Sequence, residues 1–146
     1  MVFKVEDPDI PFVQYMDTDW IQKINIKGKA PAGASRFTIY LQQGPEDEPE
    51  EVAFVFDARF NFGASQNKIV TNCKIDGAWQ TEEDKDCPFP FNEEEDFKIK
   101  IIVDDDSFKV KVNGEDLLEY EQKLSAKTIN CIRIQNDVKL TSVKLQ

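Results

Sequence analysis

The sequence predicts an all-β protein made of two packed antiparallel sheets, a sandwich or jelly roll. Apolar and polar residues alternate in many short runs, which is the period of strands that bury one face. These runs recur about every 8 to 15 residues, the spacing of all-β sandwiches. No long amphipathic helix is visible. A chain of 146 residues suffices for one hydrophobic core, so we expect a single domain over residues 1–146.

Nine strands are expected along the chain, each bounded by Gly, Pro, Asn or acidic clusters. They cover residues 22–26, 37–41, 52–57, 68–73, 97–103, 108–112, 117–120, 131–135 and 138–145. Asn113-Gly114 tolerates the positive φ angles of a tight hairpin, so the three runs from 97 to 120 predict a meander. The acidic segments 44–51 and 93–96 are expected to be solvated loops.

Composition excludes several classes of function. The net charge is −10 with 18 Lys and Arg dispersed among acids, which disfavours nucleic acid and anionic membranes as partners. No apolar stretch approaches the ~20 residues of a membrane span, and the N-terminal segment lacks an apolar signal region. We therefore expect no membrane insertion and a cytoplasmic location.

Histidine is absent, so nucleophile–histidine pairs and imidazole bases cannot be built. Cys73, Cys87 and Cys131 are an odd number without metal-ligand spacing. We expect reduced thiols, no metal site and no cofactor.

A polar constellation lies between residues 52 and 84. In the strand from Val52, Phe54 and Phe56 point to one face, and Asp57 and Arg59 share the other. Carboxylate and guanidinium together offer acceptors and a planar donor fork, which sugar hydroxyls require. In the next strand Asn72 adds an amide on that outer surface.

An aromatic platform follows in the chain. Trp79 stands in a Gly-Ala-Trp context typical of a loop or strand edge, where an indole can stack on the apolar face of a pyranose. Glu82, three residues later, is close enough to reach a sugar hydroxyl. Taken singly, each residue could be an ordinary surface or turn residue, so the interpretation depends on the combination.

This combination resembles the galectin family, whose signature runs H-x-N-x-R, then V-x-N, then W-x-x-E-x-R. The corresponding segments here are Val55-Phe56-Asp57-Ala58-Arg59, Val70-Thr71-Asn72 and Trp79-Gln80-Thr81-Glu82-Glu83-Asp84. The resemblance covers nearly the whole chain, including segments 89–91 and 108–114. It implies a galectin-like (concanavalin-like) jelly-roll sandwich that binds β-galactosides on its concave sheet without metal or cofactor.

The resemblance also assigns roles to matched positions. Arg59 would bind galactose O4 and the ring region, Asn72 and Glu82 would bind O6, and Trp79 would stack beneath galactose. Three positions depart from the pattern: Val55 replaces His, Asp57 replaces Asn and Asp84 replaces the second Arg. Val55 cannot hydrogen-bond O4, Asp57 keeps an acceptor but lacks the amide donor, and Asp84 would repel acidic glycans. We expect weakened or altered glycan specificity.

Three alternatives follow from these observations. The first is a lectin whose partners are glycans or glycoproteins. The second is a galectin fold that has lost sugar binding and acts as a protein-interaction or structural module. The third, a glycosidase using Asp57 with Glu82, is disfavoured because Arg59 beside Asp57 suits ligand binding better than proton donation. The resemblance further implies a two-fold homodimer and extracellular action without a signal peptide.

Overall fold

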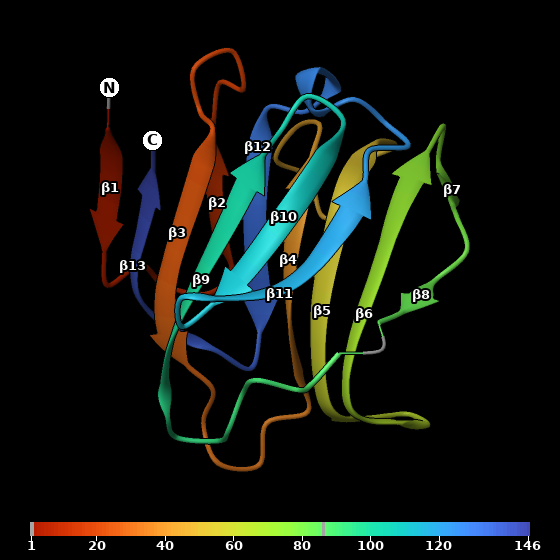
Figure 1. The fold of residues 1–146 in the computed structure, drawn as a ribbon. Coiled ribbons are helices and arrows are strands. Elements are labelled where there is room, and N and C mark those ends of the chain that lie inside the picture. Colours follow the sequence, from red (N-terminus) through yellow and green to blue (C-terminus); the bar gives the residue numbers. More distant parts are fainter. Residues whose placement is uncertain (1, 86) are drawn as a thin grey trace.

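The computed structural model describes residues 2–85 and 87–146, which form two antiparallel sheets facing each other (Figure 1). The first sheet has the strand order β1-β13-β3-β9-β10-β11 and consists of β1 (Phe3–Glu6), β13 (Lys139–Leu145), β3 (Lys23–Lys29), β9 (Asp96–Val103), β10 (Ser107–Val112) and β11 (Glu115–Glu121). The second has the order β2-β12-β4-β5-β6-β7, with β8 also paired to β6. It consists of β2 (Phe12–Tyr15), β12 (Cys131–Asn136), β4 (Arg36–Gln42), β5 (Val52–Phe62), β6 (Ser65–Ile75), β7 (Ala78–Trp79) and β8 (Glu83–Asp84).

The predicted all-β jelly-roll sandwich is confirmed. The nine expected strands correspond to β3–β6 and β9–β13, and a short 3₁₀ helix, η1 (Ala126–Thr128), is the single helical element among the described residues. Asn113 and Gly114 have φ angles of 52° and 84° and connect β10 to β11 as predicted. Sequence reasoning missed β1, β2, β7 and β8, which have two to four residues each and are too short for a period-2 pattern to stand out.

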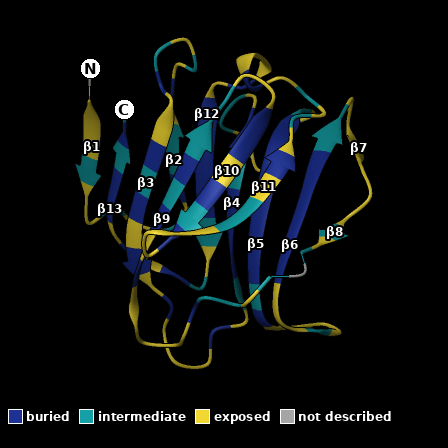
Figure 2. Cartoon of the chain, in the orientation of Figure 1, coloured by how far each residue is buried: buried dark blue, intermediate teal, exposed yellow. Residues whose placement is uncertain are grey.

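Inward-facing side chains from both sheets fill the space between them. Burial alternates along strands of the six-stranded sheet, whereas β4 and β5 of the seven-stranded sheet are buried along most of their length (Figure 2). Phe37 of β4 stacks on Phe97 of β9 at 5.2 Å between ring centroids, and Phe54 of β5 stacks on Phe108 of β10 at 5.0 Å. Phe91, from the segment before β9, meets both Phe37 and Phe97 edge-on. These aromatic pairs cross the sandwich and fix how the two sheets face each other.

The outer face of the six-stranded sheet contradicts one expectation from the sequence. Lysines that look dispersed along the chain are brought next to one another across strands, as in the pairs Lys27–Lys98 and Lys100–Lys111. This basic cluster cannot be recognised along the chain, because strand pairing, and not chain proximity, assembles it. In the part of the chain that the structure describes, no helix has the length and apolar composition of a membrane span.

Candidate functional site

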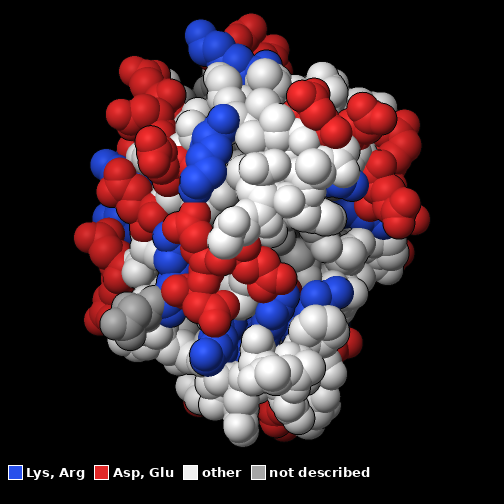
Figure 3. All heavy atoms as spheres, turned by 90° about the vertical axis from the view of Figure 1, so that its right-hand side faces the viewer, with Lys and Arg blue, Asp and Glu red and all other residues white. Residues whose placement is uncertain are grey.

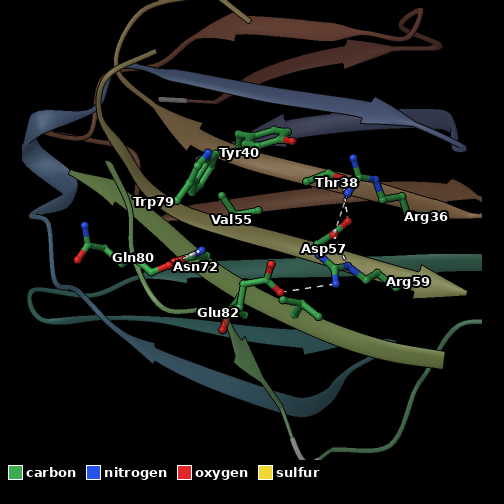
Figure 4. Close-up of a pocket in the computed structure, with 12 residues that line it drawn as sticks. Arg36, Thr38, Tyr40, Val55, Asp57, Arg59, Asn72, Trp79, Gln80 and Glu82 are labelled. Atoms are coloured by element: carbon green, nitrogen blue, oxygen red, sulfur yellow. Dashed lines mark hydrogen bonds and ion pairs between the residues drawn. The ribbon is translucent and has the colours of Figure 1, made fainter. Parts of the chain in front are cut away.

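A pocket of about 370 Å³ lies on the outer face of the seven-stranded sheet. It is formed by side chains of β4, β5 and β6 and by the segment from β7 to β8, which runs along the edge of the sheet (Figure 4). The lining residues are Arg36, Thr38, Tyr40, Val55, Asp57, Arg59, Val70, Thr71, Asn72, Trp79, Gln80 and Glu82.

Strand register explains why these residues meet. In β4, Phe37, Ile39 and Leu41 are buried in the core, so the residues between them face outward. Cross-strand pairing then aligns outward residues in rows. One row is Tyr40–Val55–Asn72 and the next is Thr38–Asp57–Val70.

Asp57 is the buried centre of the polar end of the pocket, with 4% of its surface exposed. Its Oδ1 accepts a hydrogen bond from Thr38 Oγ1 at 2.8 Å, and its Oδ2 accepts one from Arg59 Nε at 2.8 Å. Arg36 Nη1 lies 3.5 Å from the same Oδ2. A carboxylate with this many partners is stabilised in spite of its burial.

Arg59 is held on several sides. Besides Asp57, its Nη1 donates to Ser65 Oγ at 3.2 Å and lies 3.6 Å from Glu82 Oε2. The ring of Phe62 packs under two guanidinium groups, with Arg36 Cζ at 3.9 Å and Arg59 Cζ at 5.2 Å from its centroid. Ion pairing and cation–π packing therefore orient both arginines before any ligand arrives.

Asn72 connects the sheet to the segment that bears the aromatic platform. Its Nδ2 donates to the Gln80 carbonyl at 3.0 Å, and its Oδ1 accepts from the Cys73 amide at 2.8 Å. Trp79 is in β7, paired with Lys74, and is 50% exposed. The expectation that Trp79 lies at a strand edge is confirmed.

The structure brings six of the seven sequence-predicted site residues together. Val55, Asp57, Arg59, Asn72, Trp79 and Glu82 all line the pocket. Asp84 does not line it: it is in β8 opposite Val70, and its Oδ2 lies 3.7 Å from Lys68 Nζ. The acidic charge at Asp84 is therefore partly offset by Lys68.

Six pocket residues were not predicted from the sequence: Val70, Thr71 and Gln80, which stand within or beside the motif segments, and Arg36, Thr38 and Tyr40 of β4. The three β4 residues alternate with the core residues of that strand, so the strand pattern contains the signal, but nothing in β4 alone indicates that it lies beside β5. Gln135 Nε2 donates to the Tyr40 hydroxyl at 3.3 Å. Burial raises the pKa of Tyr40, with a smaller opposing effect of the positive charge of Arg36.

The pocket thus has two chemically different ends. Arg36, Thr38, Asp57 and Arg59 form a charged, hydrogen-bonding end, and Tyr40, Val55 and Trp79 form an apolar and aromatic end (Figure 4). Acidic and basic side chains lie next to each other on the side of the molecule where β6 to β8 are found (Figure 3). A ligand with one apolar face and several hydroxyl groups would match both ends.

Comparisons with known proteins agree with this geometry. Residues 14–145 match the family described as galactoside-binding lectin. Galectin-3 of Oryctolagus cuniculus is 38% identical over 120 residues, which are 82% of this chain and 47% of that protein. Congerin-2 of Conger myriaster is 25% identical over 123 residues, 84% of this chain and 88% of that protein. The chain spans about half or less of the length of the galectin-3 proteins that it matches.

Solved structures show the same fold. Galectin LEC-6 of Caenorhabditis elegans superposes with a TM-score of 0.85 at 19% identity, covering 98% of this chain and 95% of that one. Sheep galectin-11, solved in complex with glycerol, superposes with a TM-score of 0.82 at 18% identity, covering 94% and 99%.

Proposed function

This chain belongs to the galactoside-binding lectin family, and from that premise we propose that its pocket binds β-galactoside-containing glycans with weakened or altered specificity. Asp57, Arg59, Asn72, Trp79 and Glu82 are the proposed binding residues, and Val55 is the substituted position in the wall. The proposal covers a single carbohydrate-recognition domain over residues 1–146.

One observation carries the proposal: a half-exposed indole lies in the same pocket as a fixed set of hydrogen-bonding groups. Trp79 offers a flat apolar surface for the C–H face of a sugar ring. Arg59 and Glu82 offer a donor fork and an acceptor held 3.6 Å apart, which is the arrangement that neighbouring hydroxyl groups need. Because the groups are pre-organised, little binding energy is spent on ordering them.

Val55 and Tyr40 support altered specificity. Val55 lies between Tyr40 and Asn72 in the outward row and offers neither donor nor acceptor. A hydroxyl placed over it, such as the O4 of galactose in the family's binding mode, would lose a hydrogen bond. The Tyr40 ring beside it favours a ligand that places an apolar group there.

The pocket offers little to a glycosidase mechanism. That chemistry needs two carboxyl groups facing the scissile bond, one of them able to donate a proton. Each oxygen of Asp57 already accepts a hydrogen bond from the protein, and Glu82 contacts the same arginine. We therefore infer a binding protein and not an enzyme.

A second candidate is a galectin fold without sugar binding. It is favoured by the amide of Asn72, which is already bound to the backbone of Gln80 and Cys73, and by the engagement of Arg59 with Asp57, Ser65 and Glu82. In this case the protein would act through contacts with other proteins.

A homodimer remains a proposal. Val2, Phe3 and Tyr15 are exposed, and β1 and β2 are terminal strands of their sheets. Apolar residues on free strand edges favour association between copies. Sedimentation at several protein concentrations tests this independently of sugar binding.

The first test of function is a titration with lactose and with a panel of oligosaccharides lacking galactose, followed by tryptophan fluorescence. The Trp20→Phe variant removes the background, because Trp20 packs against the core and lines a different hollow. A lactose-dependent change would support the proposal, and a response only to other sugars would support altered specificity. If no sugar changes the fluorescence and calorimetry also detects no binding, the protein-interaction candidate is favoured.

A further inference from the structure

The outer face of the six-stranded sheet concentrates positive charge in an acidic protein. Ten of the fifteen lysines are placed there by strand alternation and register. This lysine face consists of Lys4, Lys23, Lys27, Lys29, Lys98, Lys100, Lys109, Lys111, Lys139 and Lys144. In Figure 1 it is the face of the sheet turned toward the viewer.

Four lysine pairs lie directly opposite each other on neighbouring strands: Lys4–Lys144, Lys139–Lys29, Lys27–Lys98 and Lys100–Lys111. Like charges in such positions destabilise a sheet. Acids lie opposite two lysines of the face, Asp96 opposite Lys29 and Glu119 opposite Lys109. At the four lysine pairs the folded protein tolerates repulsion that a bound anion would relieve.

In the described part of the chain, three acids form ion pairs with lysines of the face. Ion pairs join Lys4 to Glu6, Lys109 to Asp104 and Lys111 to Asp116. Among the described residues, the other seven lysines of the face form no ion pair. Their ammonium groups remain available to a partner.

The arrangement is linear. One row crosses the whole sheet in the order Lys4, Lys144, Asn25, Lys100, Lys111, Asp116, with roughly 4.8 Å between neighbouring strands. Beside it, a hollow of about 340 Å³ is lined by Lys27, Lys98, Lys100 and Lys111. A charged row beside a hollow suits a chain that bears separate anionic substituents.

We propose that the lysine face binds a linear sulfated polysaccharide. Lysine ammonium groups act as point charges for sulfates and carboxylates. No large exposed hydrophobic residue belongs to the face among the described residues, so it lacks the stacking groups of single-stranded nucleic-acid sites and the apolar wedges of membrane-inserting surfaces. A flat bilayer would contact the ends of the lysine side chains but would leave the hollow unfilled.

This site is independent of the proposed galactoside pocket, because the two are on the outer faces of different sheets. Binding at one should leave the other measurable. A failure of lactose binding and a failure of polysaccharide binding would therefore be distinguishable results.

The test is calorimetric titration with heparin at about 50 mM salt, repeated at higher salt. Wild-type protein should bind, with an affinity that falls steadily as salt rises. The double variant Lys27→Gln/Lys98→Gln should bind roughly tenfold or more weakly. The control Lys74→Gln/Lys127→Gln changes the net charge equally outside the face and should bind within about twofold of wild type.

Folding and site choice are checked in the same series. Removal of the Lys27–Lys98 repulsion should leave the melting temperature unchanged or higher, so weaker binding would not reflect unfolding. Trp79→Ala should keep heparin binding. The proposal would be overturned if the protein did not bind heparin, or if both double variants lost heparin affinity equally. It would also be overturned if the protein bound duplex DNA or phosphatidylserine vesicles more tightly than heparin.

Discussion

Arg59 donates a hydrogen bond from Nε to Oδ2 of Asp57 at 2.8 Å, two residues earlier in the same strand. Both side chains point out of the sheet into the pocket, and both are largely buried. The aspartate, which stands where the galectin signature has asparagine, thereby holds two arginines in one place. The charge at position 57 should therefore contribute both to stability and to the shape of the site.

Asp57→Asn should lower the free energy of unfolding by about 1–3 kcal/mol, since the arginines lose a charged hydrogen-bond partner in a poorly solvated place. Thr38 retains an acceptor, so the fold should persist. Urea denaturation measures the change. Asp84→Asn is the matched control, because Asp84 is exposed and Lys68 is its one ion-pair partner among the described residues, and it should change stability by less than about 0.5 kcal/mol. Equal effects at the two positions would contradict the role given to Asp57.

Val55→His should raise the affinity for lactose by roughly twofold to tenfold, the value of one hydrogen bond regained at this position. The side chain lines the pocket between Tyr40 and Asn72. Calorimetry on the single variant and on Val55→Asn separates a specific effect of imidazole from mere polarity. Unchanged or lower affinity for lactose would mean that one substitution is not enough to restore galactose binding, because Tyr40 or Asp57 also alters the shape of the site.

Trp79→Ala should weaken any sugar binding by roughly tenfold or more, because it removes the stacking surface. The residue is half exposed in a two-residue strand, so the unfolding free energy should change by less than about 0.5 kcal/mol. Trp79→Phe retains an aromatic face and should bind with intermediate affinity. Wild-type affinity in Trp79→Ala would place the sugar elsewhere.

The sequence predicts more of the fold than of the site. Alternation in β4 and β5 predicts which residues face outward, and the spacing of Asp57 and Arg59 predicts that they meet. The partners of Asp57 in β4 could not be predicted, because Thr38 and Arg36 become its neighbours only through strand register. The lysine face was missed for the same reason. Asp84 shows the converse: its place in the motif suggested the pocket wall, but pairing of β8 with β6 directs it toward Lys68.

An ion-pair cluster at β8 makes stability depend on pH. Glu83 accepts hydrogen bonds from Lys123 at 2.6 Å and from Lys85 at 3.0 Å, and Lys123 lowers the pKa of Glu83 below its ordinary value of 4.5. A lowered pKa in the folded state stabilises the protein above pH 4.5, and this contribution is lost as the pH falls through the folded-state value.

Lys123→Met should therefore be less stable than wild type at neutral pH, with a difference that shrinks below pH 4.5. Methionine also removes the cation–π contact of Lys123 Nζ, which lies 4.1 Å from the centroid of the Tyr120 ring, but lysine stays charged over this pH range, so that loss is the same at every pH and only the ion-pair part varies. Thermal unfolding between pH 3 and pH 7, about the titration range of carboxylates, measures this. Lys127→Met, outside the cluster, should show no such pH dependence, and a pH-independent difference for Lys123→Met would refute the ion-pair explanation.

Gly28→Ala should destabilise the protein, although strand propensity alone predicts a gain of about 0.5–1 kcal/mol from replacing glycine. Gly28 is buried in β3, and a Cβ there would lie 2.5 Å from the carbonyl oxygen of Lys139. The opposing strand β13 has an irregular register between Leu140 and Ser142, which brings its backbone close to Gly28. Because backbone atoms cannot rotate away like a side chain, the two strands must separate.

We expect Gly28→Ala to lower the free energy of unfolding by about 1–3 kcal/mol in urea denaturation. The control Lys27→Ala, at an exposed neighbouring position, should change it by less than about 0.5 kcal/mol. If Gly28→Ala were more stable than wild type, β13 would have to move away from β3 at little energetic cost. The close approach of the two strands would then not explain the glycine at position 28.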